Sequence, residues 1–170
     1  NGPDCIARDL GSLNGTWING KKSGSNDNSI RLWDTESGIE IRSFEGHPKV
    51  ACFSPDGKMV LASGYENNAQ LWEIENGKKI REFVGHLESL SSACFSPDGR
   101  FILTGSRDNT VRLWDIESGL QIWRQLEHSN DIFFASFSKD GRCFLTTSED
   151  CVRIWELDWE WEFPDEIIST

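Results

Sequence analysis

The sequence predicts an all-β fold made of repeated four-stranded antiparallel meanders, for two reasons. The first is a period near 40 residues: a Phe-Ser-Pro-Asp-Gly or Phe-Ser-Lys-Asp-Gly turn begins at Phe53, Phe95 and Phe137, with spacings of 42 and 42. The second is the alternation of side chains along short runs such as VRLWD at 111–115, which is the period of a strand. A constant period of this length indicates a repeat architecture.

Residues 87–128 show the order of strands within one repeat. The run SSACFS precedes the turn S-P-D-G, and the run FILTGS follows it. The turn R-D-N-T separates FILTGS from VRLWD, and D-I-E-S-G separates VRLWD from LQIWRQL, the fourth strand. One such sheet cannot bury both of its faces, so we expect consecutive sheets to stack face to face.

The same pattern divides the whole chain into an N-terminal segment and a series of repeats. Residues 1–22 lie outside the repeat, and residues 23–170 carry it. The expected repeats are a partial one at 23–47 and three further ones at 48–86, 87–128 and 129–163.

The composition excludes some classes of partner. The 170 residues include 17 Lys and Arg against 28 Asp and Glu, a formal net charge of −11. A field of this sign repels phosphate backbones and anionic lipid, so we expect neither nucleic acid nor a membrane as partner. Simple solubility is the alternative meaning of the charge. Five cysteines without a Cys-X-X-Cys pair, and no apolar run of about 18–20 residues, favour the reducing cytoplasm.

The repeated order Gly-His, Phe-Ser-Pro-Asp-Gly, Thr-Gly-Ser-Arg-Asp and Arg-Leu-Trp-Asp resembles the WD repeat of β-propellers over roughly residues 23–158. The resemblance implies propeller blades, each with a buried hydrogen-bond chain. That chain links the His of Gly-His, a Ser or Thr of the second strand, the Asp of the following turn and the Trp of the third strand. Three blades and part of a fourth are an odd count for rings of about 4–8 blades. We therefore expect an open arc, with a strained four-bladed ring or a ring-completing homodimer as alternatives.

The residues of this implied chain can be placed blade by blade. In the third blade they are His86, Thr104, Asp108 and Trp114. In the fourth they are His128, Thr146, Asp150 and Trp155, with Asp150 one residue closer to its Trp. The second has His47, Ser63 and Trp72, with Asn67 in place of the Asp, and the first has Ser23, Asp27 and Trp33. A catalytic triad has no reason to recur in every repeat, so we predict a structural role, with no catalytic residue, metal site or cofactor.

The segment 6–22, IARDLGSLNGTWINGKK, contains two Asn-Gly steps around TWI, which predict a β-hairpin. The run D-L-G-S-x-N-G-T-W-x-N-G also resembles the forkhead-associated domain, which implies phosphothreonine-peptide binding through Asn14 and Ser12. The phosphate-binding Arg and Ser of that family come from earlier loops, which this chain lacks. We expect a remnant of such a domain joined to a truncated propeller, as in a fragment of a longer bacterial signalling protein. A further hypothesis is that residues 16–20 pair with residues 23–33 and supply the missing outer or inner strand of the first blade.

The C-terminal residues 156–166 contain six acidic side chains and no basic one. Within them, Trp159, Trp161 and Phe163 alternate with two glutamates, so one face is aromatic and the other acidic. We expect the outer strand of the last blade here. The alternative is a linear peptide that docks on another domain through its aromatic side chains.

These observations favour a non-catalytic scaffold that binds other proteins or peptides. The WD-repeat resemblance implies that partners contact the upper rim, near the Gly-His loops. The predicted rim residues are Ser89, Ser91, Arg107, Asp131, Phe133 and Glu149. Phe133 and Phe134 form the most partner-like patch, because alternation points one of two adjacent aromatics outward; burial of both in the core is the alternative. Phosphothreonine-peptide binding, an enzyme with a site in a central channel, and a truncated chain without independent function are the alternative functions.

Overall fold

The protein is described by a computed structural model that covers residues 16–19, 29–34, 37–45, 48–64, 66–125 and 128–157. Within these ranges every regular element is a β-strand, β1 to β14. The all-β prediction is therefore confirmed. No helix in this part of the chain has the length and apolar character needed to cross a membrane.

The strands form four antiparallel sheets, each built from strands that follow one another in the chain. Sheet A contains β1 (Thr16–Asn19), β2 (Ser29–Asp34) and β3 (Glu40–Glu45). Sheet B contains β4 (Pro48–Phe53), β5 (Met59–Gly64), β6 (Asn68–Glu73) and β7 (Lys79–Val84). Sheet C contains β8 (Leu90–Phe95), β9 (Phe101–Ser106), β10 (Val111–Asp115) and β11 (Gln121–Gln125). Sheet D contains β12 (Phe134–Phe137), β13 (Cys143–Thr147) and β14 (Val152–Glu156).

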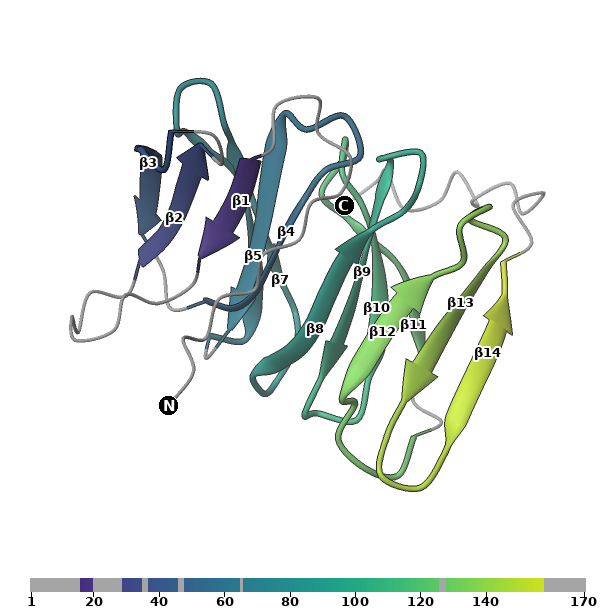
Figure 1. Cartoon of the computed structure of the whole chain (residues 1–170). Helices are drawn as coiled ribbons and strands as arrows, with labels where there is room; N and C mark the ends of the chain where they lie inside the picture. The colour runs from purple at the N-terminus through teal and green to yellow at the C-terminus, as the bar shows by residue number, and fades with distance from the viewer. Residues whose placement is uncertain are drawn as a thin grey trace.

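The sheets follow one another in chain order and do not close a ring. Figure 1 shows sheet A at the left and β14 of sheet D at the right, as the two ends of an open arc. The open arc predicted from the number of repeats is thus the arrangement observed.

Strand β1 pairs with β2, as the hypothesis for residues 16–20 requires. The register runs antiparallel from Thr16 opposite Asp34 to Asn19 opposite Arg31. Strand β2 carries Trp33 and corresponds to the third strand of a complete sheet, so β1 occupies the place of the second strand and not that of the outer or inner strand that was predicted. Among the described residues, sheet A contains no counterpart of the first strand.

The Phe-Ser-X-Asp-Gly turns have one hydrogen-bond pattern in sheets B, C and D. In sheet B the Ser54 hydroxyl donates to Asp56 Oδ1 at 2.6 Å and accepts the N–H of Met59 at 2.9 Å. The corresponding serines of the other two turns make the same pair of bonds. Gly57 has φ +71, a left-handed conformation that glycine adopts without steric cost. These turns fix the register of the first strand against the second.

Each apolar core lies between two neighbouring sheets, which is what stacking of meanders predicts. The core between sheets A and B contains Ile30, Leu32, Phe44, Phe53, Val60 and Ala62. The core between B and C contains Leu61, Ala69, Leu71, Phe83, Leu90, Ala93, Phe95, Ile102 and Trp114. The core between C and D contains Phe101, Leu103, Val111, Leu113, Ile132, Ala135 and Phe144.

The outermost strand of each sheet also contacts the next sheet along the chain. Arg42 of β3 donates to a carbonyl of the β6–β7 turn at 2.8 Å, and Arg81 of β7 donates to two carbonyls of the β10–β11 turn at 2.9 and 3.1 Å. Trp123 takes the place of Arg81 in β11, since Leu113 is opposite Trp123 as Leu71 is opposite Arg81.

Trp123 connects its sheet to the next one by aromatic contacts instead of hydrogen bonds. Its ring lies 5.3 Å from the Phe144 ring and 5.8 Å from the Trp155 ring, both edge-on. Neighbouring sheets are therefore joined both at the core and at the outer strand.

Sheet D exposes an apolar face, whereas the equivalent face of sheet C is buried. Val152 and Ile154 are 67% and 74% exposed, whereas the equivalent Val111 and Leu113 of sheet C are 0% and 2% exposed. Sheet C is covered on this face by sheet D, but no further sheet packs on sheet D within the described ranges. The exposure is a direct consequence of the open arc.

Candidate functional site

A buried chain of polar side chains crosses sheet C. Thr104 Oγ1 accepts the indole N–H of Trp114 at 2.8 Å and lies 2.8 Å from His86 Nε2. On its other side, His86 Nδ1 lies 3.0 Å from Asp108 Oδ2. The Thr110 hydroxyl also donates to Asp108, at 2.6 Å. The four residues predicted for this blade therefore form one connected network.

The environment of this network fixes its protonation at neutral pH. Burial alone would raise the pKa of Asp108, but hydrogen bonds from His86, Thr110 and the N–H of Leu87 outweigh burial and hold that pKa well below 3.8. Burial lowers the pKa of His86 below 6.5, more than the Asp108 carboxylate raises it. A neutral imidazole thus donates Nδ1–H to a carboxylate, inside the fold.

The network of sheet D begins in the same way and ends differently. His128 Nε2 lies 2.7 Å from Thr146 Oγ1, which accepts the Trp155 indole N–H at 2.9 Å. His128 Nδ1, however, lies 2.8 Å from the Ser148 hydroxyl, and Ser148 in turn donates to Asp150 Oδ1 at 2.7 Å. The expected contact between His128 and Asp150 is therefore replaced by one through Ser148.

The length of the β13–β14 turn explains why Ser148, and not Asp150, contacts His128. Asp150 lies five positions before Trp155, whereas Asp108 lies six positions before Trp114, so the turn of sheet D is one residue shorter. The shorter turn leaves Asp150 exposed to solvent, where bonds from Ser148 and Ser129 lower its pKa.

Cys151 lies beside His128 in this shorter turn. Its Sγ is 3.7 Å from His128 Nδ1 and 3.6 Å from the Ser148 hydroxyl. In sheet C, the imidazole Nδ1 is instead 3.1 Å from the Thr110 hydroxyl. Sequence reasoning missed Cys151, Ser148 and Thr110, although the one-residue difference in turn length marked the place.

The predicted network of sheet B is wrong at two positions. Trp72 is opposite Val60, just as Trp114 is opposite Ile102, so the residue equivalent to Thr104 is Ala62 and not Ser63. A slip of one residue along a strand moves a side chain to the other face of the sheet. Accordingly, among the described residues, the buried Ser63 hydroxyl and the buried Trp72 indole N–H have no hydrogen-bond partner.

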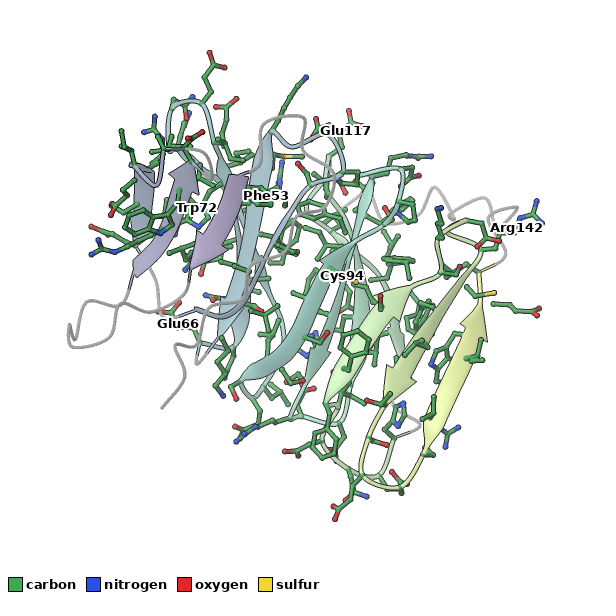
Figure 2. All side chains as sticks on the ribbon, in the orientation of Figure 1. Phe53, Glu66, Trp72, Cys94, Glu117 and Arg142 are labelled. Carbon is green, nitrogen blue, oxygen red and sulfur yellow. The ribbon has the colours of Figure 1, made fainter. Side chains whose placement is uncertain are left out.

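The same alignment of sheets B and C changes which residue of sheet B is equivalent to Asp108. Counting from Trp72, Glu66 and not Asn67 occupies the position of Asp108. Glu66, labelled in Figure 2, lies exposed in the β5–β6 loop. Asn67 instead donates to the carbonyl of Leu87 at 2.8 Å and so joins sheets B and C.

Several predicted residues lie outside the described part of the chain. They are Ser12, Asn14, Ser23, Asp27 and His47, together with the C-terminal aromatics Trp159, Trp161 and Phe163. Trp33 is described, in β2, on the strand that pairs with β1.

The predicted rim residues gather where sheets C and D meet. Arg107 Nε lies 3.8 Å from Asp131 Oδ2, with side chains 58% and 46% exposed. The N–H of Arg107 donates to the carbonyl of Ser89 at 3.1 Å. Phe133 is 55% exposed, and Glu149 is also exposed. Ser91 differs from this group, because its half-buried hydroxyl donates to carbonyls of Gly105, at 3.2 Å, and Ile132.

Phe133 and Phe134 are both exposed. The sequence, in contrast, predicts that only one of them points outward, or that both are buried in the core. Phe133 precedes β12, and its N–H donates to the Thr147 carbonyl at 2.8 Å. Phe134 begins β12 at the position of Ser92, which in sheet C bonds to Ala135 of sheet D. Phe134 therefore points to the face that a further sheet would cover.

The sequence was compared with known proteins. No curated protein matches it. The family model for the WD domain, G-beta repeat, matches residues 38–73, 77–115 and 120–156, which together make up more than half of the chain. Each matched range contains the outer strand of one sheet and three strands of the next, so the sequence repeat is offset from the sheet by one strand. With its stacked four-stranded sheets and open ends, the chain belongs to the WD40 repeat family and forms an incomplete β-propeller.

Proposed function

We propose that this protein is a non-catalytic scaffold whose partners bind the rim between sheets C and D. The observation that carries the proposal is the exposed Phe133 next to the exposed ion pair of Arg107 and Asp131. Aromatic side chains, Phe among them, and Arg are enriched in protein interfaces relative to the rest of the surface. The WD40 family generally mediates protein–protein interaction, which supports the proposal.

The buried His-Asp pair of sheet C supports a structural role for the networks. His86 and Asp108 have side chains 0% and 4% exposed, so no substrate reaches them. Proteins of the WD40 family are typically non-enzymatic scaffolds. The function therefore rests on surface contacts and not on chemistry at these residues.

The charge of the chain narrows the class of partner. With a net charge of −11, basic protein surfaces are favoured as partners, and nucleic acid and anionic lipid are disfavoured. Thiols that donate to carbonyls between sheets, such as those of Cys52 and Cys94, support a reducing cytoplasm as the place of action. Cys94 is labelled in Figure 2.

The exposed face of sheet D supports a second contact, with another copy of the chain. A homodimer that continues the stack would cover Val152 and Ile154 as sheet D covers sheet C. Light scattering tests this directly: the dimer has twice the mass of the 19.3 kDa chain. A monomeric mass at concentrations well above those used for binding would contradict it.

Binding of a phosphothreonine peptide through Ser12 and Asn14 stays a prediction, as does the origin in a bacterial signalling protein. The sequence D-L-G-S-x-N-G-T-W-x-N-G, which resembles the forkhead-associated domain, supports the peptide-binding prediction. Titration of a phosphothreonine peptide against its unphosphorylated form distinguishes this function from binding at the rim.

A photo-crosslinking amino acid placed at position 133 tests the rim. The matched control carries it at Leu120, which is 50% exposed in the β10–β11 turn, at the other end of the strands. We expect discrete cross-linked partners from position 133 and not from position 120. The same products from both positions, or none from either, would refute binding at the rim.

A further inference from the structure

Three side chains with metal-binding atoms meet at one corner of sheet D. They come from the segment before β12 and from the β13–β14 turn: His128, Asp150 and Cys151. Their imidazole nitrogen, carboxylate oxygen and thiol sulfur all lie within 4.8 Å of one another. Ligand atoms around one tetrahedral ion lie about 3.3–3.8 Å apart, since metal–ligand bonds are about 2.0–2.3 Å long, so the three side chains close in by at most about 1.5 Å on binding.

The equivalent corner of sheet C is closed to an ion. There, the Asp108 carboxylate and the Thr110 hydroxyl lie 3.0 and 3.1 Å from His86 Nδ1, and the Asp108 side chain is 4% exposed. In sheet D a thiol takes the place of the Thr110 hydroxyl, and the carboxylate has moved to the surface. The shorter turn thus combines a buried imidazole with a half-buried thiol and a solvent-exposed carboxylate, which gives an ion a path from water.

The chemistry of these three donors selects one class of ion. Imidazole, thiolate and carboxylate are the ligands of zinc, and three protein ligands leave a fourth position for water. Magnesium and calcium take oxygen ligands, so a site with sulfur and nitrogen disfavours them. The strongly negative chain adds a favourable field for any cation.

Neighbouring residues hold the donors in place. His128 Nε2 is 2.7 Å from Thr146 Oγ1, which also accepts the Trp155 indole N–H, so the orientation of the imidazole ring is fixed. Ser129 donates to Asp150 Oδ2 at 2.9 Å. Partners of this kind orient ligands in known zinc sites.

We propose that His128, Asp150 and Cys151 form a zinc site. On binding, the Cys151 thiol loses its proton to solvent and the thiolate joins the ion. His128 binds through the Nδ1 lone pair while Nε2–H donates to Thr146. The Ser148 hydroxyl, now 2.8 Å from Nδ1 and 2.7 Å from Asp150, gives up its contact with the imidazole. The ion fastens the segment that leads to Asp131 and Phe133 to the β13–β14 turn.

Cobalt replaces zinc as a visible probe, because a cobalt–thiolate bond gives a charge-transfer absorption band. The untagged full chain is titrated with Co²⁺, and Zn²⁺ is then added to displace it. We expect one equivalent of Co²⁺ to bind with the thiolate band, and zinc to abolish that band. Absence of the band in the unaltered chain would overturn the proposal.

Two single variants locate the site. Cys151→Ser should lose the thiolate band and bind zinc at least tenfold more weakly. The matched control is Cys143→Ser, a half-buried thiol on β13 of the same sheet, which should behave like the unaltered chain. Loss of the band in the Cys143 variant, or its retention in the Cys151 variant, would place the metal elsewhere.

A second design keeps the fold while removing the Cys151 thiol and restoring the turn length of sheet C. Insertion of Asn between Asp150 and Cys151, together with Cys151→Thr, copies the Asp-Asn-Thr turn of sheet C. This variant should fold, as judged by circular dichroism, and bind no Co²⁺ with a thiolate band. Zinc binding equal to that of the unaltered chain would refute a site built on Cys151 and on the shorter turn.

Discussion

Substitution of Ala62 by Thr tests the corrected network of sheet B. Ala62 occupies the position at which Thr104 and Thr146 accept an indole N–H, at 2.8 and 2.9 Å. In sheet B the indole N–H of Trp72 is buried and, within the described part of the chain, has no hydrogen-bond partner. Ala62→Thr should supply that partner.

The magnitude follows from comparison with Ala62→Val, which has the same shape without the hydroxyl. Both variants add volume to a residue that is 4% exposed, at an equal cost of about 1–3 kcal/mol for the tighter packing. The hydrogen bond itself contributes about 0.5–1.5 kcal/mol, and satisfying a buried donor adds to this. We therefore expect the Thr variant to be more stable than the Val variant by about 1–2 kcal/mol.

Urea denaturation followed by circular dichroism measures the difference in the free energy of unfolding between the two variants. Thermal unfolding should show it as well, as a shift of about 2–8 °C. If the Val variant is as stable as the Thr variant, then Ala62 does not occupy the position of Thr104. If Ser63→Ala destabilises the protein as strongly as loss of a buried hydrogen bond, the original assignment of Ser63 is restored.

The remaining predictions concern the network of sheet C and the joints between sheets. Asp108→Asn should lower the free energy of unfolding by about 3 kcal/mol at pH 7, because a buried carboxylate loses a charge-assisted bond to His86. The pKa of Asp108 is lowered by folding, so its contribution is complete above the unfolded value near 3.8 and is lost as pH falls below it. The difference between the two proteins should therefore shrink from pH 5 to pH 2 in urea titrations; a constant difference would contradict this. Trp123→Ala should cost about 3 kcal/mol through lost contacts with sheet D, whereas Arg81→Ala should cost at most about 1 kcal/mol because its bonds are exposed; equal costs in urea denaturation would refute this ranking.

The fold could be predicted from the sequence because the residues of the turns determine where each strand begins and ends. The Ser, Asp and Gly of each Phe-Ser-X-Asp-Gly turn make bonds that only one backbone conformation allows, so the spacing of turns sets strand length and sheet order. Trp114 and His86 were assigned correctly to one network for the same reason, since the turns beside them match the repeat.

The details of the network could not be predicted with the same success. The repeat pattern predicts Ser63 for this position, whereas strand pairing puts Ala62 on the same face of the sheet as Trp72. For Asp150, the sequence showed a shorter turn without showing where the carboxylate would go. The residue type alone does not determine the face of a strand or the direction of a side chain in a turn.

The one-strand offset between the sequence repeat and the sheet affects what happens when the gene gains or loses a repeat. A duplicated or deleted repeat carries three strands of one sheet and the outer strand of its predecessor, as residues 77–115 do. Gain or loss of a whole repeat therefore preserves every junction between neighbours, since each new outer strand meets an existing sheet of the same kind. Genes of this type can change their number of repeats in a single recombination event, while the unit that is copied is never the unit that folds.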